Sequence, residues 1–174
     1  IDGYVTNEGI ELIGEKLELA TAEVTAVSTF YTQYKSKPVG EYHVGVCTNT
    51  LCAVMGGDAI YESIKEHLNI GNDEVTADGK VSVEHIECNA ACDYAPVVMV
   101  NWEFYDNQTV QSVKDLVDGA RTGNPPAPTR GPKTLRTWKQ NSAVLAGISD
   151  GLANEGVQAG EATLLGLKKA KGGN

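Results

Sequence analysis

Two stretches decide the fold, CTNTLC at residues 47–52 and CNAACDYAPVVMV at residues 88–100. They contain all four cysteines of the 174-residue chain, as one Cys-x4-Cys pair and one Cys-x3-Cys pair. The chain opens without Met, a basic segment or an apolar run, so we expect an incomplete N-terminus and no secretory signal. In a reducing cytosol, cysteines serve in metal binding or redox chemistry more often than in structural disulfides.

Each cysteine pair follows a predicted strand. Val44 and Val46 alternate with the residues between them, which predicts a strand over 42–47 that ends on Cys47. Residues 81–88 predict a second strand, and helical spacing over 58–69 predicts a helix capped by Asp58. If the two strands are parallel neighbours joined by this helix, both cysteine pairs lie at the same edge of the sheet.

The cysteine spacing alone leaves four uses open. A 2Fe-2S cluster is favoured, because four thiolates that reach two irons suit a wide spacing such as the Cys-x4-Cys of plant-type ferredoxins. A zinc site with four cysteine ligands is the first rival, although its pairs are usually Cys-x2-Cys. Disulfides and unrelated buried thiols are the other two alternatives.

After the second cysteine pair the sequence predicts two more strands and a helix. Residues 97–100 are continuously apolar, residues 103–105 form a shorter strand, and Asp106-Asn107 is a turn. Thr109 then caps a helix with a clear apolar face. From residue 42 the expected α/β order is strand, helix, strand, strand, strand, helix.

Two further segments flank this domain. The N-terminal segment, 1–38, is expected to hold a helix over 6–18 and a second helix over 22–34 capped by Thr21. The α/β domain follows over 39–123. Residues 124–174 form a Pro-rich linker and a C-terminal arm, with a short helix from Trp138.

Composition excludes several classes of function. The 23 acidic and 14 basic side chains give a formal charge of -9, which disfavours nucleic acid and anionic lipid as partners. The longest uncharged apolar run, PVVMV, is far shorter than the roughly 20 residues that span a bilayer. No Gly-x-Gly-x-x-Gly and no Ser-His-Asp set is present, so we expect no catalytic residues and no dinucleotide site in this chain. His43, His67 and His85 are not paired in one loop as Rieske ligation requires.

Several motifs together resemble the E-type subunits of respiratory NADH:quinone oxidoreductase, complex I. The motifs are AEVTAVSTFY (22–31), KPVG (37–40), VCTN (46–49), CAVMG (52–56) and CNAACDYAP (88–96). The resemblance covers about 4–122, and TRGP at 129–132 is similar to a segment of bacterial members. One departure concerns Ala90, where many members have Gly. If the loop requires a positive φ there, Ala90 is strained by about 1 kcal/mol.

The resemblance implies a thioredoxin-like ferredoxin domain behind a small helical segment and before an extended C-terminal arm. It also implies one 2Fe-2S cluster with the metal ligands Cys47, Cys52, Cys88 and Cys92, and it suggests a cis peptide bond at Ala95-Pro96. The chain would then carry single electrons near the flavin of a partner, an FMN- and NADH-binding flavoprotein subunit. It would work as a subunit of this proton-translocating oxidoreductase, in the peripheral arm on the cytoplasmic side of the membrane, without inserting into it.

Two other functions stay open at this point. One is the equivalent subunit of an NAD-linked hydrogenase or formate dehydrogenase, and the other is a zinc-stabilised interaction module without redox chemistry. We further expect that residues 122–148, with Arg130, Arg136 and Trp138, lie on a partner subunit and not on this chain's own core. Thr29-Phe30-Tyr31 is the second candidate for a partner contact.

Overall fold

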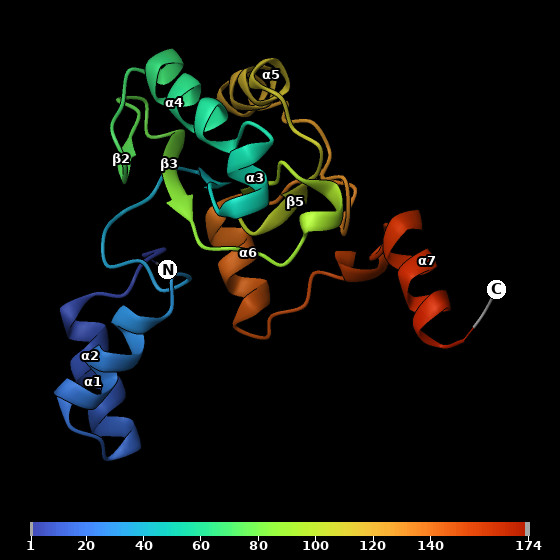
Figure 1. Cartoon of the computed structure of the whole chain (residues 1–174). Coiled ribbons are helices and arrows are strands. Elements are labelled where there is room, and N and C mark those ends of the chain that lie inside the picture. Colours follow the sequence, from blue (N-terminus) through green and yellow to red (C-terminus); the bar gives the residue numbers. More distant parts are fainter. Residues whose placement is uncertain (1, 173–174) are drawn as a thin grey trace.

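A computed structural model describes residues 2–172, and its centre is a five-stranded sheet with helices on both faces (Figure 1). Residue 1 and residues 173–174, which are the outer ends of the expected first and third segments, lie outside this range. The helices are α1 (Asn7–Leu17), α2 (Thr21–Phe30), α3 (Thr50–Val54), α4 (Gly57–Leu68), α5 (Val110–Arg121), α6 (Trp138–Leu145) and α7 (Glu161–Ala170), with short 3-10 turns at Cys92–Tyr94 and Leu152–Asn154. The strands are β1 (Tyr42–Cys47), β2 (Glu74–Val75), β3 (Val81–Ile86), β4 (Val98–Val100) and β5 (Glu103–Tyr105).

The sheet confirms the expected parallel pair. Its strand order is β2-β3-β1-β4-β5. β1 and β3 are parallel neighbours with Cys47 opposite Ile86, while the other strand pairs are antiparallel. The carboxyl ends of β1 and β3 therefore lie side by side, and the two cysteine loops leave the sheet at the same edge.

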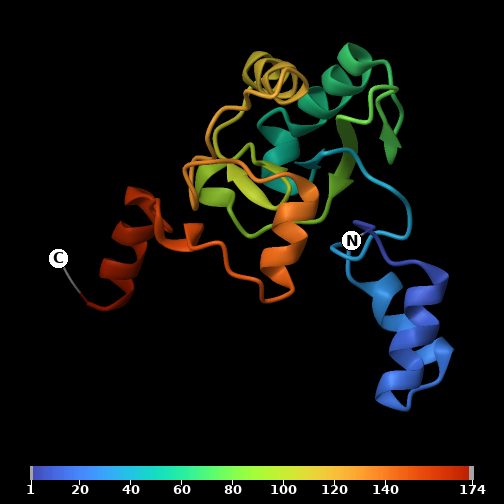
Figure 2. The ribbon, with the colours of Figure 1, turned by 180° about the vertical axis from the view of Figure 1, so that it is seen from behind.

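The core lies between one face of the sheet and helices α4 and α5. Val44, Val46 and Val83 are fully buried there against Ile64 of α4 and Val113 of α5. The ribbon seen from both sides places α4 and α5 over this face and α6 across the other (Figures 1 and 2). The expected α/β class is confirmed.

Helices α1 and α2, which together form the N-terminal hairpin, agree with the two expected helices except at the ends of α2. Thr6 caps α1, because its hydroxyl accepts a hydrogen bond from the amide of Gly9. The cap of α2 is Ala20 and not Thr21, since the Glu23 carboxylate accepts the Ala20 N–H at 2.8 Å. The helix ends at Phe30, four residues earlier than expected, because Tyr31 has extended backbone.

Three expectations near the cysteines are wrong. The strand β3 ends at Ile86 and not on Cys88, because its partner β1 ends opposite this residue. Helix α4 begins at Gly57 with Gly56 as its cap, so Asp58 is already inside the first turn. The short elements α3 and β2 are absent from the expected order, because neither is long enough to show a periodic pattern.

The segment after α5 packs on this chain's own core, so the expectation that it lies on a partner is wrong. Leu135 belongs to the main core, and Trp138 is 5% exposed with its indole edge against His43. The buried Asn101 side chain accepts a hydrogen bond from the backbone amide of His43 and donates one to the backbone carbonyl of Arg136. The backbone with the prolines ends at Pro132, and Leu135 and Trp138, which follow it, are buried.

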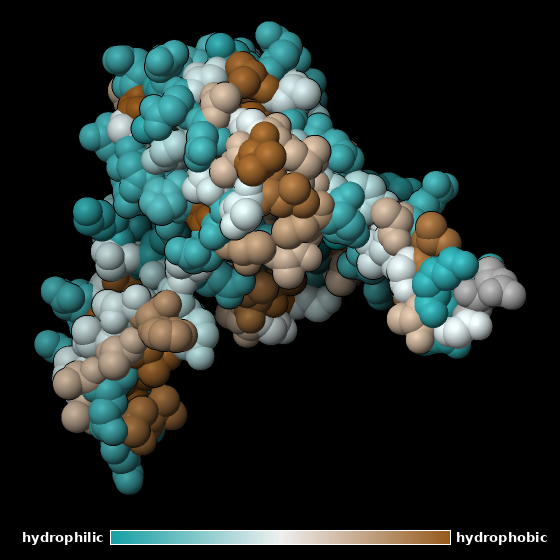
Figure 3. Space-filling view, in the orientation of Figure 1, coloured by the Kyte–Doolittle hydropathy of each residue, from teal (hydrophilic) through white to brown (hydrophobic). Residues whose placement is uncertain are grey.

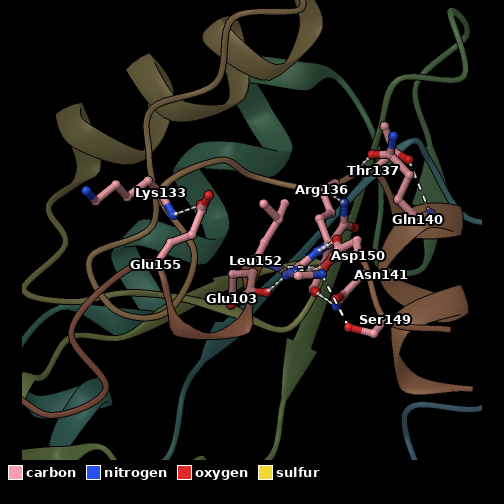
Figure 4. Close-up of polar contacts among 12 residues, drawn as sticks. Glu103, Lys133, Arg136, Thr137, Gln140, Asn141, Ser149, Asp150, Leu152 and Glu155 are labelled. Atoms are coloured by element: carbon pink, nitrogen blue, oxygen red, sulfur yellow. Dashed lines mark hydrogen bonds and ion pairs between the residues drawn. The ribbon is translucent and has the colours of Figure 1, made fainter. Parts of the chain in front are cut away.

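An ion cluster around the buried Arg136 holds the far part of this segment. Arg136 donates two hydrogen bonds to the carboxylate of Asp150 and a third, at 3.0 Å, to Glu103 of β5 (Figure 4). Burial raises the pKa of Glu103, while the Arg136 guanidinium holds the pKa of Asp150 down at about 2.

Within residues 2–172, none of the helices has the length and apolar character needed to cross a membrane.

Candidate metal centre

The first cysteine pair is buried at the end of β1. Cys47 is the last residue of this strand, and its amide donates to the carbonyl of Val97 at 3.1 Å. Cys52 is the third residue of α3, and both cysteines are only 3% exposed. They pack with Ala91, Ala95 and Val97, so the two cysteine loops share one small apolar cluster.

Gly57 explains how this pair is enclosed. A Cβ atom at this position would lie 2.5 Å from the carbonyl oxygen of Cys47 and 2.9 Å from that of Cys52. The preceding Gly56 has φ +109°, which a side chain would strain. The two glycines let α4 start directly against the first cysteine loop, a role that the sequence pattern did not reveal.

The second cysteine pair lies in the loop between β3 and β4 and is exposed. Cys88 stands two residues beyond β3, and Cys92 opens a 3-10 turn. Ala90 between them has φ +54°, so the loop does take a positive φ at this residue. Its amide donates a hydrogen bond to the sulfur of Cys88 at 3.4 Å. The Ala95-Pro96 peptide bond that follows is cis, as the resemblance suggested.

The thiols of the two pairs influence one another. Burial is the main reason why the pKa of the Cys52 thiol is raised to about 11. A hydrogen bond with the backbone of Val97 lowers this pKa, whereas the thiols of Cys47 and Cys92 raise it further. The thiol of Cys88, followed by desolvation and by Cys47, raises the pKa of Cys92. Members of both pairs are therefore electrostatic neighbours at one edge of the sheet. A metal that binds thiolates would displace these protons.

The donor set suits an iron–sulfur cluster. A 2Fe-2S cluster divides four thiolates between two irons, two to each, whereas a zinc site draws all four cysteines around one ion. The soft thiol donors, the sulfur-directed amide of Ala90 and the burial of one pair all fit the cluster.

The surface beside the cysteines is apolar. Leu51, Val54 and Met55 on and after α3 are 42%, 81% and 52% exposed, and they flank the buried Cys52. Figure 3 shows brown and tan side chains gathered over α3 amid a mostly hydrophilic surface. Exposed apolar residues that lie together in this way are typical of surfaces that contact another protein.

Each histidine has a partner other than a cysteine. His43 is buried and bonds Ser82 and Glu84 with its two ring nitrogens, each at 2.8 Å. His67 pairs with Asp118 on α5, and the ring of His85 lies edge-on to Tyr61.

Phe30 and Tyr31, at the end of the N-terminal hairpin, are 78% and 56% exposed.

The comparisons agree with one family. The profile of the thioredoxin-like 2Fe-2S ferredoxins matches residues 1–121. The E-type subunit of the NADH-quinone oxidoreductase of Mycobacterium tuberculosis is 57% identical over 171 residues, which cover 98% of this chain and 68% of the relative. The HndA subunit of the NADP-reducing hydrogenase of Solidesulfovibrio fructosivorans is 36% identical over 115 residues, 66% of this chain and 67% of that relative.

One solved structure supports the fold alone. The NAD+-reducing NiFe hydrogenase in its air-oxidised state superimposes with a TM-score of 0.60 at 18% identity. The match covers 68% of this chain and 21% of the hydrogenase chain.

Proposed function

This chain belongs to the thioredoxin-like 2Fe-2S ferredoxin family, and from that premise we propose which residues hold its cluster and which partner supplies its electrons. It carries a 2Fe-2S cluster and is an electron-carrying subunit of an NADH-quinone oxidoreductase. The resident cluster supplies a one-electron couple, and the remaining tasks fall to the polypeptide.

The ligands we propose are Cys47, Cys52, Cys88 and Cys92. One observation carries this assignment: the two pairs leave the neighbouring parallel strands β1 and β3 at the same edge, and Ala91 and Ala95 of the second loop pack with Cys47 and Cys52. The buried pair is rigid, because it is fixed by β1, α3 and Gly57. The exposed pair lies in a loop, so that it can close on the metal from the solvent side.

The chain's own groups would set the redox potential. The amide of Ala90 directs a partial positive charge at the Cys88 sulfur, which favours the more negative reduced state. The net charge of -9 acts against an added electron. The acidic chain as a whole therefore favours a low potential.

The partner we propose is an FMN- and NADH-binding flavoprotein subunit of the same complex. The exposed Leu51, Val54 and Met55 offer it an apolar contact beside Cys52, and Phe30 and Tyr31 offer a second contact on the N-terminal hairpin. The same arrangement would hold the cluster edge toward the flavin. We place the chain in the peripheral arm, on the cytoplasmic side of the membrane.

Ligation can be tested by changing each cysteine to serine. We expect the full chain to bind two irons and two sulfides, and each Cys→Ser variant at 47, 52, 88 or 92 to lose the cluster or its normal spectrum, because serine is a harder and less available ligand at neutral pH. Thr50→Ser and Asn89→Ser, in the same two loops, should keep it. Stoichiometric zinc without visible absorbance would contradict the assignment and favour the interaction module.

The partner can be tested with NADH. Addition of NADH to the assembled complex should reduce this centre if its potential permits, while the isolated chain should not respond, because it has no dinucleotide motif. Direct reduction of the lone chain by NADH would refute the proposal. The subunit composition of the purified complex would distinguish this enzyme from the NADP-reducing hydrogenase to which the HndA relative belongs.

A further inference from the structure

The C-terminal segment beyond residue 121 lies outside the part matched by the family profile, yet it reaches the second cysteine loop. The hydroxyl of Tyr94, two residues after Cys92, accepts a hydrogen bond from the amide of Ala162 at 3.1 Å. Gly160 lies so close that a Cβ atom there would be 2.1 Å from the Tyr94 hydroxyl oxygen. The side chains of Thr163 and Asp93 are also hydrogen-bonded. The segment therefore folds over the turn that presents Cys92.

Arg130 brings a positive charge to the same place. Its guanidinium carbon lies 4.2 Å from the ring centre of Phe104 and 5.6 Å from that of Tyr94. Phe104 packs against the apolar cluster that contains Cys47 and Cys52. The guanidinium is thus one aromatic layer away from one cysteine pair, and its other aromatic neighbour, Tyr94, stands two residues along the chain from Cys92.

The charge of Arg130 is partly buried and paired on one side. Its side chain is 14% exposed and donates one hydrogen bond, at 2.7 Å, to the carboxylate of Asp106, which is 8% exposed. The Asp106 carboxylate also accepts a hydrogen bond from the hydroxyl of Thr129 at 2.9 Å. The buried Nε of Arg130 has no hydrogen-bond partner within residues 2–172. Charges in such surroundings are screened much less than charges on the surface.

Resting on the proposed function, we propose that Arg130 is a positioning residue for the redox centre: it holds Tyr94 and Phe104 against the cysteine loops and raises the reduction potential of the cluster. Reduction adds negative charge to an anionic core inside an acidic protein. A nearby cation stabilises the reduced form, and Asp106 limits this effect by pairing with it. The segment after residue 121 thereby adjusts a centre whose ligands all lie before it.

The test compares four variants of the full, cluster-loaded chain in redox titrations followed by electron paramagnetic resonance. Arg130→Met leaves the buried carboxylate of Asp106 unpaired. We expect the equilibrium constant for reduction to fall about tenfold, which is a drop of about 59 mV for one electron. Asp106→Asn leaves the guanidinium unpaired and should raise the potential, and the double variant should return close to the parent. Lys133→Met removes an exposed positive charge three residues away and should leave the potential unchanged.

The signs of the shifts separate charge from disturbance. If Arg130→Met and Asp106→Asn shift the potential in the same direction, or if Arg130→Met does no more than Lys133→Met, the inference is wrong. Should Arg130→Met fail to retain its cluster, Asp106→Asn decides the matter, and an unchanged potential in that variant refutes the inference. A parent chain that holds no iron would overturn the proposed function itself, whereas a loaded chain with unshifted variants overturns only the role of Arg130.

Discussion

The amide of Ala90 donates a hydrogen bond to the sulfur of Cys88, and Ala90 can do so because its backbone is left-handed, with φ +54°. The loop needs this geometry to turn between the two cysteines of the second pair. At a residue with a Cβ atom the turn carries steric strain, which glycine would avoid.

Ala90→Gly should therefore stabilise the second cysteine loop. Relief of the strained φ contributes about 1 kcal/mol, partly offset by the greater freedom of glycine in the unfolded chain. We expect a higher urea midpoint for loss of the visible absorbance. The control is Ala91→Gly, since Ala91 has φ -108° and is 5% exposed, so this change removes buried contact without relieving strain. Equal effects of the two substitutions would show that strain at Ala90 is unimportant.

Leu135→Ala should destabilise the whole domain, although this residue lies beyond the part matched by the family profile. Leu135 is 6% exposed within the main core, so its truncation should cost about 2–5 kcal/mol in the free energy of unfolding. Leu145→Ala, at a position 58% exposed on α6, should change it by no more than about 0.5 kcal/mol. Urea unfolding followed by far-UV circular dichroism measures both. Similar small effects would mean that the segment is loosely held.

The stability of the C-terminal segment should depend on acid through Asp150. Hydrogen bonds from Arg136, followed by the amide of Leu152, hold the pKa of Asp150 at about 2, below its ordinary value of 3.8. Because the folded pKa is lower than the unfolded one, the stabilisation is present above about pH 4 and is lost as the pH falls toward 2.

Asp150→Asn should remove this part of the pH profile. We expect its unfolding midpoint to be lower than that of the parent at pH 6 and the difference to shrink between pH 4 and pH 2. Glu103→Gln is the contrasting variant, because burial raises the pKa of Glu103 and its pH dependence therefore has the opposite sign. A constant difference between Asp150→Asn and the parent at all pH values would refute the linkage.

The N-terminal hairpin should loosen when Glu84 is neutralised. The Glu84 carboxylate bonds His43 of β1 and forms an ion pair with Lys35, which follows α2. Burial alone would raise the pKa of Glu84, but these two partners outweigh it and keep the carboxylate charged. Glu84→Gln should therefore speed tryptic cleavage after Lys35, as followed by mass spectrometry. Glu66→Gln on the exposed side of α4 should not alter the cleavage rate.

The sequence by itself determined the elements with strong local signals. Thr109 caps α5 through Ser112, Thr6 caps α1, and the alternating residues of β1 form a strand over 42–47 as predicted. The two cysteine spacings and the motifs around them indicated the family and the cofactor. All these signals depend on a few neighbouring residues, which is why they can be read without coordinates.

Tertiary structure alone decided the rest. The strand β3 stops at Ile86 because β1 ends opposite it, and α4 starts at Gly57 because no Cβ atom fits against the first cysteine loop. Leu135 and Trp138 are buried by a sheet whose strands lie far earlier in the chain, so proline content near them could not reveal their packing. The guanidinium of Arg130 likewise lies over the rings of Phe104 and Tyr94, which come more than 20 residues earlier in the chain. Contacts between distant residues depend on how the strands pair and how the helices cover them, and no local pattern encodes that arrangement.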